Sequence, residues 1–154
     1  NKGWPMLVGP GLDVEKLEVA AIGIGIAGAA LDDAWAYAQE RRQFGRRIGE
    51  FQSIQHKLAD MQTQIHAARL TLYHAAWLAN ARRPCSSETS MAKLFATEVA
   101  KAAALECQTI LGAYGYVKDF DAERYVRDAL LMPIIGGSSA VQRGNIFKQA
   151  MAMR

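Results

Sequence analysis

This 154-residue sequence contains few residues that break helices or cross-link chains. It has four prolines and two cysteines, Cys85 and Cys107. Two cysteines do not make the disulfide framework of a small secreted protein, so a reducing cytosol is the default expectation. Because proline is scarce and alanine abundant, long stretches are free of helix breakers. The composition therefore favours an all-α domain.

Long hydrophobic runs and an excess of one charge are also missing. The longest apolar run extends only from Val19 to Leu31. A transmembrane helix needs ~20 such residues, so this run indicates a buried helix. The net charge is +3, and basic residues are mixed with acids rather than gathered in a stripe. We therefore expect neither a membrane span nor a nucleic-acid partner.

Common catalytic and metal-binding motifs are absent as well. The sequence has no Cys-x-x-Cys, no P-loop and no G-x-S-x-G. No two of the three histidines stand four residues apart, so adjacent helical turns do not pair them on a metal. These histidines are His56, His66 and His74. We predict no metal site.

One glycine pattern matches the dinucleotide motif G-x-G-x-x-G, at Gly23, Gly25 and Gly28. That motif needs a strand before it and a second parallel strand that ends in an acid ~20 residues later. Here the pattern stays helical through Ala38, and the next segment is rich in arginine. A helix whose small residues allow close packing is the favoured interpretation, with a Rossmann fold as the alternative.

The breakers that are present divide the chain into helices. Residues 1–12 form an irregular lead-in, and residues 13–154 form the helical domain. The predicted helices extend from about Val14 to Arg42, from Ile54 to Asn80, from Ser86 or Ser87 to Leu111, from Ala122 to Met132 and from Ser139 to Met153. Asp13 is the expected N-cap of the first helix, and Ser86 or Ser87 that of the third. Short loops between such helices predict an antiparallel four-helix bundle with an additional short C-terminal helix.

One of these helices shows an apolar periodicity that predicts its buried face. In the second helix the apolar residues step by four and three without a miss: Ile54, Leu58, Met61, Ile65, Ala68, Leu72 and Ala75. Such a seam is typical of a helix bundle. The third helix continues through the apolar residues Met91, Leu94, Phe95, Val99, Ala102 and Leu105 to about Leu111.

The segment from Arg127 to Arg143 ends one helix and begins another. Pro133 ends the first helix, and Gly136-Gly137 allows positive φ and close approach of a ligand. Ser138 or Ser139 can cap the next helix, and Ser139 with Gln142 fits a capping box. Free N–H groups at such a helix start suit a ligand oxygen. Taken alone, the segment favours an ordinary helix–helix corner.

Two charged clusters allow both a structural and a functional interpretation. Asp13, Glu15 and Glu18 gather at one helix start, where acids complement the helix dipole. The arginines around Phe44 fit either a solvated loop or a phosphate site with bidentate contacts. These arginines are Arg41, Arg42, Arg46 and Arg47. Spacing alone leaves both alternatives open.

The order of several motifs carries a family resemblance. Residues 41–52 read R-R-Q-F-G-R-R-I-G-E-F-Q, and residues 58–61 read L-A-D-M. This resembles the C-terminal domain of the acyl-CoA dehydrogenases, which have R-x-x-F-G, F-Q and L-A-D-M at this spacing. G-A-Y-G-Y at 112–116 and E-R-Y-V-R-D-A at 123–129 are similar to that family's later motifs. The resemblance extends from about Gly3 to Phe147.

The resemblance implies a function for a longer polypeptide. In this family the C-terminal domain is a four-helix bundle with a short helical tail, and the subunit also has an N-terminal helical domain and a central β-domain. Neither precedes the bundle here, so we expect one domain of a larger protein, inactive alone. The implied activity is FAD-dependent α,β-dehydrogenation of an acyl-CoA in fatty acid metabolism. The implied partners are an electron-transfer flavoprotein and other copies of the chain, as a dimer or tetramer.

The resemblance also leaves alternatives. An acyl-CoA oxidase or another flavoprotein of the same fold is one, and a non-catalytic helical oligomerisation module is another. The implied location is the bacterial cytoplasm or the mitochondrial matrix, with the cytoplasm preferred.

The position of the catalytic base departs from the commonest family pattern. In many members the base is the Glu of I-Y-E-G-T, whereas the matching residues here are I-I-G-G-S, with Gly136 in the place of Glu. Isovaleryl-CoA and long-chain members carry the Glu in a D-x-E-R stretch of the first helix, and here that stretch is D-V-E-K at 13–16. The resemblance therefore implies that Glu15 is the base, with Glu18 as a weaker substitute.

The remaining site residues are carried over by the same motif matching. Arg41, Phe44 and Gln52 match residues that contact the pyrophosphate and adenine side of the FAD of a neighbouring subunit. Thr109 stands where a Gln lies beside the flavin, one residue from Gln108, and Ala113 replaces a Gly of the same loop. Ser138 matches a Thr that contacts the cofactor. The implied substrate-binding residues are Asp13, Lys16 and Gly137.

Overall fold

The computed structural model describes Gly3 and residues 11–152 of the chain. Within this range the α-helices are α2 (Leu12–Glu40), α3 (Gln52–Asn80), α4 (Ser86–Leu111), α5 (Ala122–Leu131) and α6 (Ser139–Ala152). A two-stranded antiparallel hairpin, β1 (Arg42–Gln43) and β2 (Arg46–Arg47), follows α2. Two 3₁₀ turns, η2 (Ile48–Glu50) and η3 (Gly112–Gly115), complete the described elements. The predicted all-α class is confirmed.

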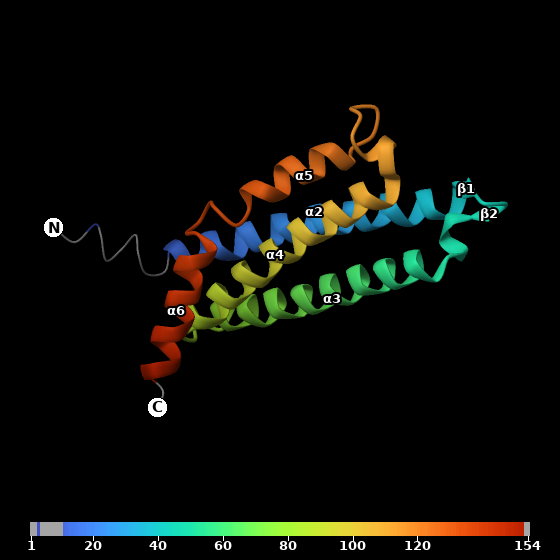
Figure 1. The fold of residues 1–154 in the computed structure, drawn as a ribbon. Helices are drawn as coiled ribbons and strands as arrows, with labels where there is room; N and C mark the ends of the chain where they lie inside the picture. Colours follow the sequence, from blue (N-terminus) through green and yellow to red (C-terminus); the bar gives the residue numbers. More distant parts are fainter. Residues whose placement is uncertain (1–2, 4–10, 153–154) are drawn as a thin grey trace.

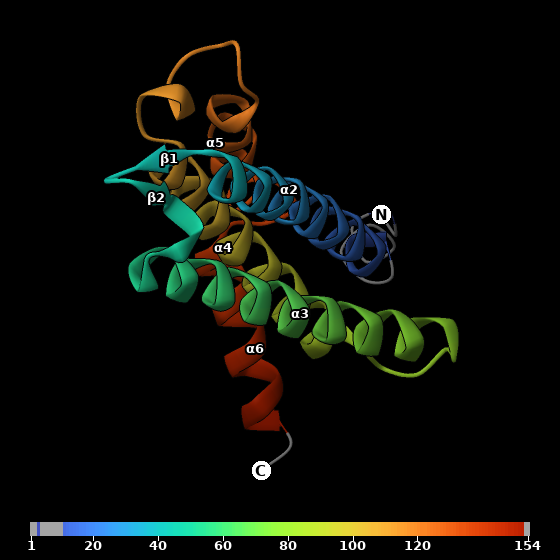
Figure 2. The same cartoon turned by 90° about the vertical axis from the view of Figure 1, so that its right-hand side faces the viewer.

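The helices form an antiparallel bundle with α4 at its centre. Helices α2 and α4 run in one direction, α3 and α5 return, and α6 crosses the end of the bundle that lies away from the hairpin (Figure 1). Helix α4 packs against each of the other four helices. The view in Figure 2 shows α6 extending below α4, beyond the bundle. Two ends are thereby defined, the hairpin end and the α6 end.

Small side chains fill the interface between α2 and α4. The buried positions of α4 include Ala92, Ala96, Ala100 and Ala104, and those of α2 include Gly23. A Cβ added at Gly23 would lie 3.3 Å from the carbonyl oxygen of Ala96. The predicted close-packing role of the small residues therefore fits α2, and the G-x-G-x-x-G match lies inside a helix rather than after a strand.

Two glycines of α2 should respond differently to replacement by alanine. A Cβ at Gly25 meets nothing within 4 Å, unlike one at Gly23. We expect Gly25→Ala to raise the free energy of unfolding of the chain by roughly 0.5–1 kcal/mol, because alanine restricts the unfolded chain and favours the helix. Gly23→Ala should gain less or lose stability, since α4 must move. Urea unfolding of the two variants measures the difference, and equal gains would contradict it.

The seam predicted for α3 is confirmed, and α4 buries a face made mainly of small side chains. Six of the seven α3 positions are buried, and Ile54 is half-buried. On α4, Val99 is buried, whereas Met91, Phe95 and Leu105 are exposed. Ala102 is exposed and Leu94 only half-buried. The alanine face packs inward because it lets α2 approach closely, which leaves the larger apolar side chains outside.

The predicted helix caps also need correction. Helix α2 begins at Leu12, so Asp13 lies inside its first turn and is not its N-cap. Helix α4 begins at Ser86 after Cys85, and neither Ser86 nor Ser87 occupies the cap position. The predicted irregular lead-in lies almost entirely at residues outside the described range. None of the described helices is both long and apolar enough to span a bilayer.

Candidate functional site

Glu15 and Gly136 lie next to each other at the α6 end of the bundle. Glu15 is in the first turn of α2, and Gly136 is in the turn between α5 and α6. A Cβ added at Gly136 would lie 3.8 Å from Oε1 of Glu15 and 3.2 Å from Cγ2 of Val19. The carboxylate, exposed in this chain, therefore borders the space that a side chain at Gly136 would enter.

The turn between α5 and α6 depends on its two glycines. Gly136 has φ +60° and Gly137 has φ +87°, values in the left-handed region that favours glycine. A Cβ at Gly137 would also lie 2.7 Å from Nε2 of Gln142. Gly137 therefore needs to be glycine for two reasons: its φ is positive, and the Gln142 side chain packs against its Cα. The residue is exposed at the surface of the turn.

Side chains from α4 and α6 hold this turn in place. Nε2 of Gln142 donates hydrogen bonds to the carbonyl oxygens of Gly136 and Gly137, each at 3.0 Å. Nζ of Lys93, on α4, donates to the carbonyl oxygen of Gly137 at 2.8 Å. Among the described residues, the backbone N–H groups of Gly136, Gly137 and Ser138 have no acceptor. The turn thus presents three free donors at the start of α6.

The serines after the glycines correct the predicted capping box. Oγ of Ser138 accepts a hydrogen bond from the N–H of Val141 at 3.4 Å, so Ser138 caps α6. Oγ of Ser139 instead donates to Oε1 of Glu98 on α4 at 2.9 Å. Because the Gln142 amide is engaged with the glycine carbonyls, the pair of Ser139 and Gln142 does not form a capping box.

Asp13 and Lys16, the predicted substrate-binding pair, are engaged with each other and with α4. Nζ of Lys16 donates to Oδ1 of Asp13 at 3.0 Å, and Lys16 is buried. Oδ2 of Asp13 accepts a hydrogen bond from Ser86 at 2.7 Å, and its Oδ1 accepts one from Thr89 at 2.9 Å. These contacts fix the start of α2, and with it Glu15, against the start of α4.

The Asp13 network should stabilise the fold in a pH-dependent way. Burial by itself raises the pKa of the Asp13 carboxyl, but the hydrogen bonds it accepts, that of Ser86 first, outweigh burial and hold the pKa below its ordinary value. The folded pKa is lower than the unfolded one, so the stabilisation is present above about pH 4 and is lost as pH falls through the folded pKa. We expect Asp13→Asn to cost about 1–3 kcal/mol at pH 7.

The measurement is urea unfolding of both proteins between pH 7 and pH 3. The difference between Asp13 and the Asn variant should shrink as the pH falls. A difference independent of pH would show that the charge of Asp13 contributes nothing.

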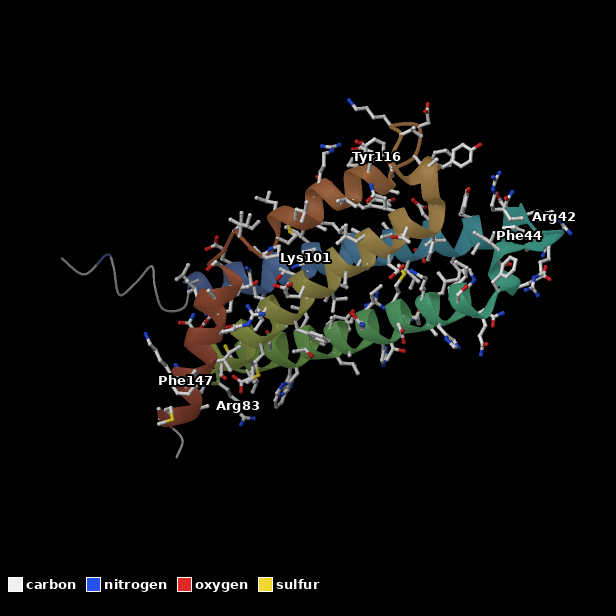
Figure 3. The ribbon with its side chains drawn as sticks, viewed as in Figure 1. Arg42, Phe44, Arg83, Lys101, Tyr116 and Phe147 are labelled. Carbon is white, nitrogen blue, oxygen red and sulfur yellow. The ribbon has the colours of Figure 1, made fainter. Side chains whose placement is uncertain are left out.

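The predicted FAD contacts Arg41, Phe44 and Gln52 lie together at the hairpin end. Figure 3 shows Phe44 and its neighbour Arg42 at the end of the molecule that lies away from Phe147 on α6. Phe44 is 91% exposed with φ +53°, so a strained turn holds its ring outside the bundle. A shallow hollow of about 320 Å³ beside Phe44 has mostly apolar walls.

The loop after α4 joins this group through an aromatic residue. The guanidinium of Arg41 lies 5.7 Å from the centre of the Tyr114 ring, next to Ala113. Thr109 is exposed on the last turns of α4, where its Oγ1 donates to the carbonyl oxygen of Leu105. Tyr114 was missed by motif matching, although its place between two glycines marks it as a loop aromatic.

The structure therefore separates the predicted cofactor residues into two groups. Arg41, Phe44, Gln52, Thr109 and Ala113 belong to the hairpin end, whereas Ser138 lies at the α6 end. From Lys93, which touches the turn, to Thr109, helix α4 rises by about 24 Å at 1.5 Å per residue. Exposed guanidinium groups beside an exposed aromatic ring suit a nucleotide pyrophosphate and its base, so the hairpin residues fit one half of a dinucleotide.

Lys93 and Gln142 are the contacts of the turn that sequence reasoning missed. Lys93 has an exposed fraction of 0% and Gln142 one of 1%. A signal was present for Lys93, because it stands beside Ala92 and Ala96 on an alanine-rich stretch of α4. A lysine among residues that pack into a helix interface is rarely buried unless its ammonium group has a hydrogen-bond acceptor or a paired acid.

Comparisons with known proteins agree with these motifs. Residues 1–151 match the family described as acyl-CoA dehydrogenase, C-terminal domain. The chain is 47% identical over 140 residues to the probable acyl-CoA dehydrogenase YngJ of Bacillus subtilis, covering 91% of this chain and 37% of that protein. It is 44% identical over 143 residues to subunit CarC of the caffeyl-CoA reductase–Etf complex of Acetobacterium woodii, covering 93% and 38%.

The fold has solved counterparts as well. Butyryl-CoA dehydrogenase from Megasphaera elsdenii superposes with a TM-score of 0.89 at 39% identity, over 93% of this chain and 37% of that one. The chain thus spans well under half the length of these relatives.

Proposed function

The chain belongs to the acyl-CoA dehydrogenase family, as its C-terminal domain, and on that premise we propose that it serves an FAD-dependent dehydrogenation of an acyl-CoA thioester with Glu15 as the base. The observation that carries the proposal is the position of the Glu15 carboxylate. Its Oε1 lies 3.8 Å from where a side chain at Gly136 would begin. An acid supplied by α2 therefore borders the space that the turn residue leaves empty.

Different residues of this chain supply the base, the hydrogen-bond donors and the positioning contacts at the thioester. Glu15 accepts the proton from the α-carbon, which requires a carboxylate held close to that carbon and shielded from bulk water. The free N–H groups of the Gly136–Ser138 turn can donate to the thioester carbonyl oxygen, where negative charge develops as the proton leaves. A bound FAD would supply the acceptor for the hydride that leaves the β-carbon. Asp13 and Lys16 fix the start of α2 and so the position of Glu15.

The two separated groups of cofactor residues support an oligomer. We propose that the hairpin of one subunit contacts the nucleotide half of an FAD, while Ser138 of another subunit contacts the same cofactor. An FAD shared in this way makes each site incomplete without a neighbour, which fits a dimer or tetramer. The relation to a subunit of an Etf complex supports an electron-transfer flavoprotein as the electron acceptor.

The test is anaerobic mixing of the full-length flavoprotein with a panel of acyl-CoA thioesters of different length and branching. Loss of the oxidised flavin absorbance with at least one thioester supports the proposal. A flavin that no thioester reduces would favour a non-catalytic module. Rapid oxygen consumption during turnover, in place of electron transfer to a flavoprotein, would identify an oxidase.

A further inference from the structure

A buried lysine with no ion pair lies behind the glycine turn. Lys93 has an exposed fraction of 0%, and within the described residues no carboxylate forms a salt bridge with it; its hydrogen-bond partner is the carbonyl oxygen of Gly137. Burial lowers the pKa of Lys93, and the charge of Glu98 opposes that shift. Burying an ammonium group without a paired carboxylate costs free energy. Packing alone would therefore favour an apolar residue at position 93.

The two glycine carbonyls of the turn accept hydrogen bonds from buried side chains of α4 and α6. The Gly137 carbonyl accepts from both Lys93 and Gln142, and the Gly136 carbonyl accepts from Gln142. The Gln142 amide is oriented by these two bonds, and its Oε1 is left without a partner among the described residues. A buried acceptor without a partner costs free energy, so the side chain is held in this pose by the turn.

Anchoring the carbonyls also orients the donors of the same peptide groups. In a trans peptide the C=O and N–H bonds point in opposite directions. Because the carbonyls of Gly136 and Gly137 point toward Lys93 and Gln142, the N–H groups of Gly137 and Ser138 point away from these side chains, toward the exposed side of the turn. Rotation of either peptide plane would turn those donors inward.

We propose that Lys93 is a positioning residue for the dehydrogenation: with Gln142 it locks the two glycine carbonyls inward, so that the turn's N–H groups stay aimed at the thioester oxygen. This inference rests on the proposed function. The lysine touches neither substrate nor cofactor and acts through the backbone of the turn. A cation on the carbonyl side also polarises the Gly137–Ser138 peptide group, which makes its N–H a stronger donor.

The test uses Lys93→Met in the full-length holoenzyme, because methionine keeps an unbranched apolar chain and removes the donor. We expect kcat to fall roughly 10-fold with little change in KM, since the donors act on charge that develops in the transition state. Hydrogen–deuterium exchange of the peptide that contains residues 134–141 should become faster. A non-oxidisable acyl-CoA analogue should give a weaker long-wavelength flavin absorbance, because that band reports α-deprotonation.

The matched control is Lys57→Met, which removes a lysine from a part-buried pair with Glu106, near the start of α3 and the end of α4 and so toward the hairpin end. It should leave kcat and the exchange of residues 134–141 unchanged. If Lys93→Met does not fold, Gln142→Met is tested in its place by the same measurements, and we expect the same loss of kcat.

The outcomes separate the two proposals. An active parent whose folded Lys93→Met or Gln142→Met variant keeps the parent's kcat and exchange rate overturns this inference alone. A parent holoenzyme that no thioester reduces overturns the proposed function.

Discussion

Replacing Glu15 by Gln in the full-length flavoprotein should slow flavin reduction by an acyl-CoA by about 10²- to 10⁴-fold. The amide keeps the shape of the side chain but does not accept the α-proton at neutral pH. Binding of the thioester should change little, because the contacts at the Gly136–Ser138 turn remain. The measurement is anaerobic stopped-flow absorbance of the flavin, with substrate affinity taken from the concentration dependence of the rate.

Glu18→Gln is the matched control for this prediction. Glu18 lies one turn further along α2 and is exposed like Glu15, but it supplies none of the three atoms nearest to a Cβ built at Gly136. Its variant should reduce flavin at nearly the parent rate. A normal rate in the Glu15 variant, or a slow rate in the Glu18 variant alone, would remove Glu15 from the role of base.

The sequence predicted the helices well because each is marked by local chemistry. The α3 seam steps by four and three without interruption, and a stripe of this kind has one way to face a core. We predicted no buried face for α4, whose inward side carries small residues. Alanines such as Ala96 and Ala100 are buried there, where they let α2 approach closely, whereas Phe95 and Met91 are exposed.

The nearness of Glu15 and Gly136, which stand far apart in the sequence, was predicted from the family resemblance. Members of that family keep the Glu at one position or the other, and the structure brings the two positions together. The contacts of Lys93 and Gln142 with backbone carbonyls were not predictable, because a sequence does not tell which carbonyl a side chain will reach. Asp13 was misassigned as a cap for the same reason: its partners Ser86 and Thr89 come from another helix.

The space shared by Glu15 and Gly136 also allows the carboxylate to be moved from position 15 to position 136. A Cβ at Gly136 would begin 3.8 Å from Oε1 of Glu15, so a glutamate placed there has its carboxylate within reach of the volume that Glu15 now occupies. Two costs oppose it: the backbone at Gly136 has φ +60°, which costs a non-glycine residue about 1–2 kcal/mol, and the new Cβ lies 3.2 Å from Val19. Both costs are small compared with the loss of rate that follows from removing the base.

We therefore expect the double variant Glu15→Gln with Gly136→Glu to reduce flavin about 100-fold faster than Glu15→Gln alone, within the range that a general base contributes. Gly136→Glu by itself should be slower than the parent, because two carboxylates in one space raise the pKa of the pair and move the acid limb of the rate profile to higher pH. Stopped-flow flavin reduction across pH 5–9 distinguishes the three proteins. Recovery would show that the reaction requires a carboxylate in this space, whichever helix or turn supplies it. A double variant no faster than Glu15→Gln, in folded protein with normal FAD content, would show that the Gly136 position does not reach the α-carbon.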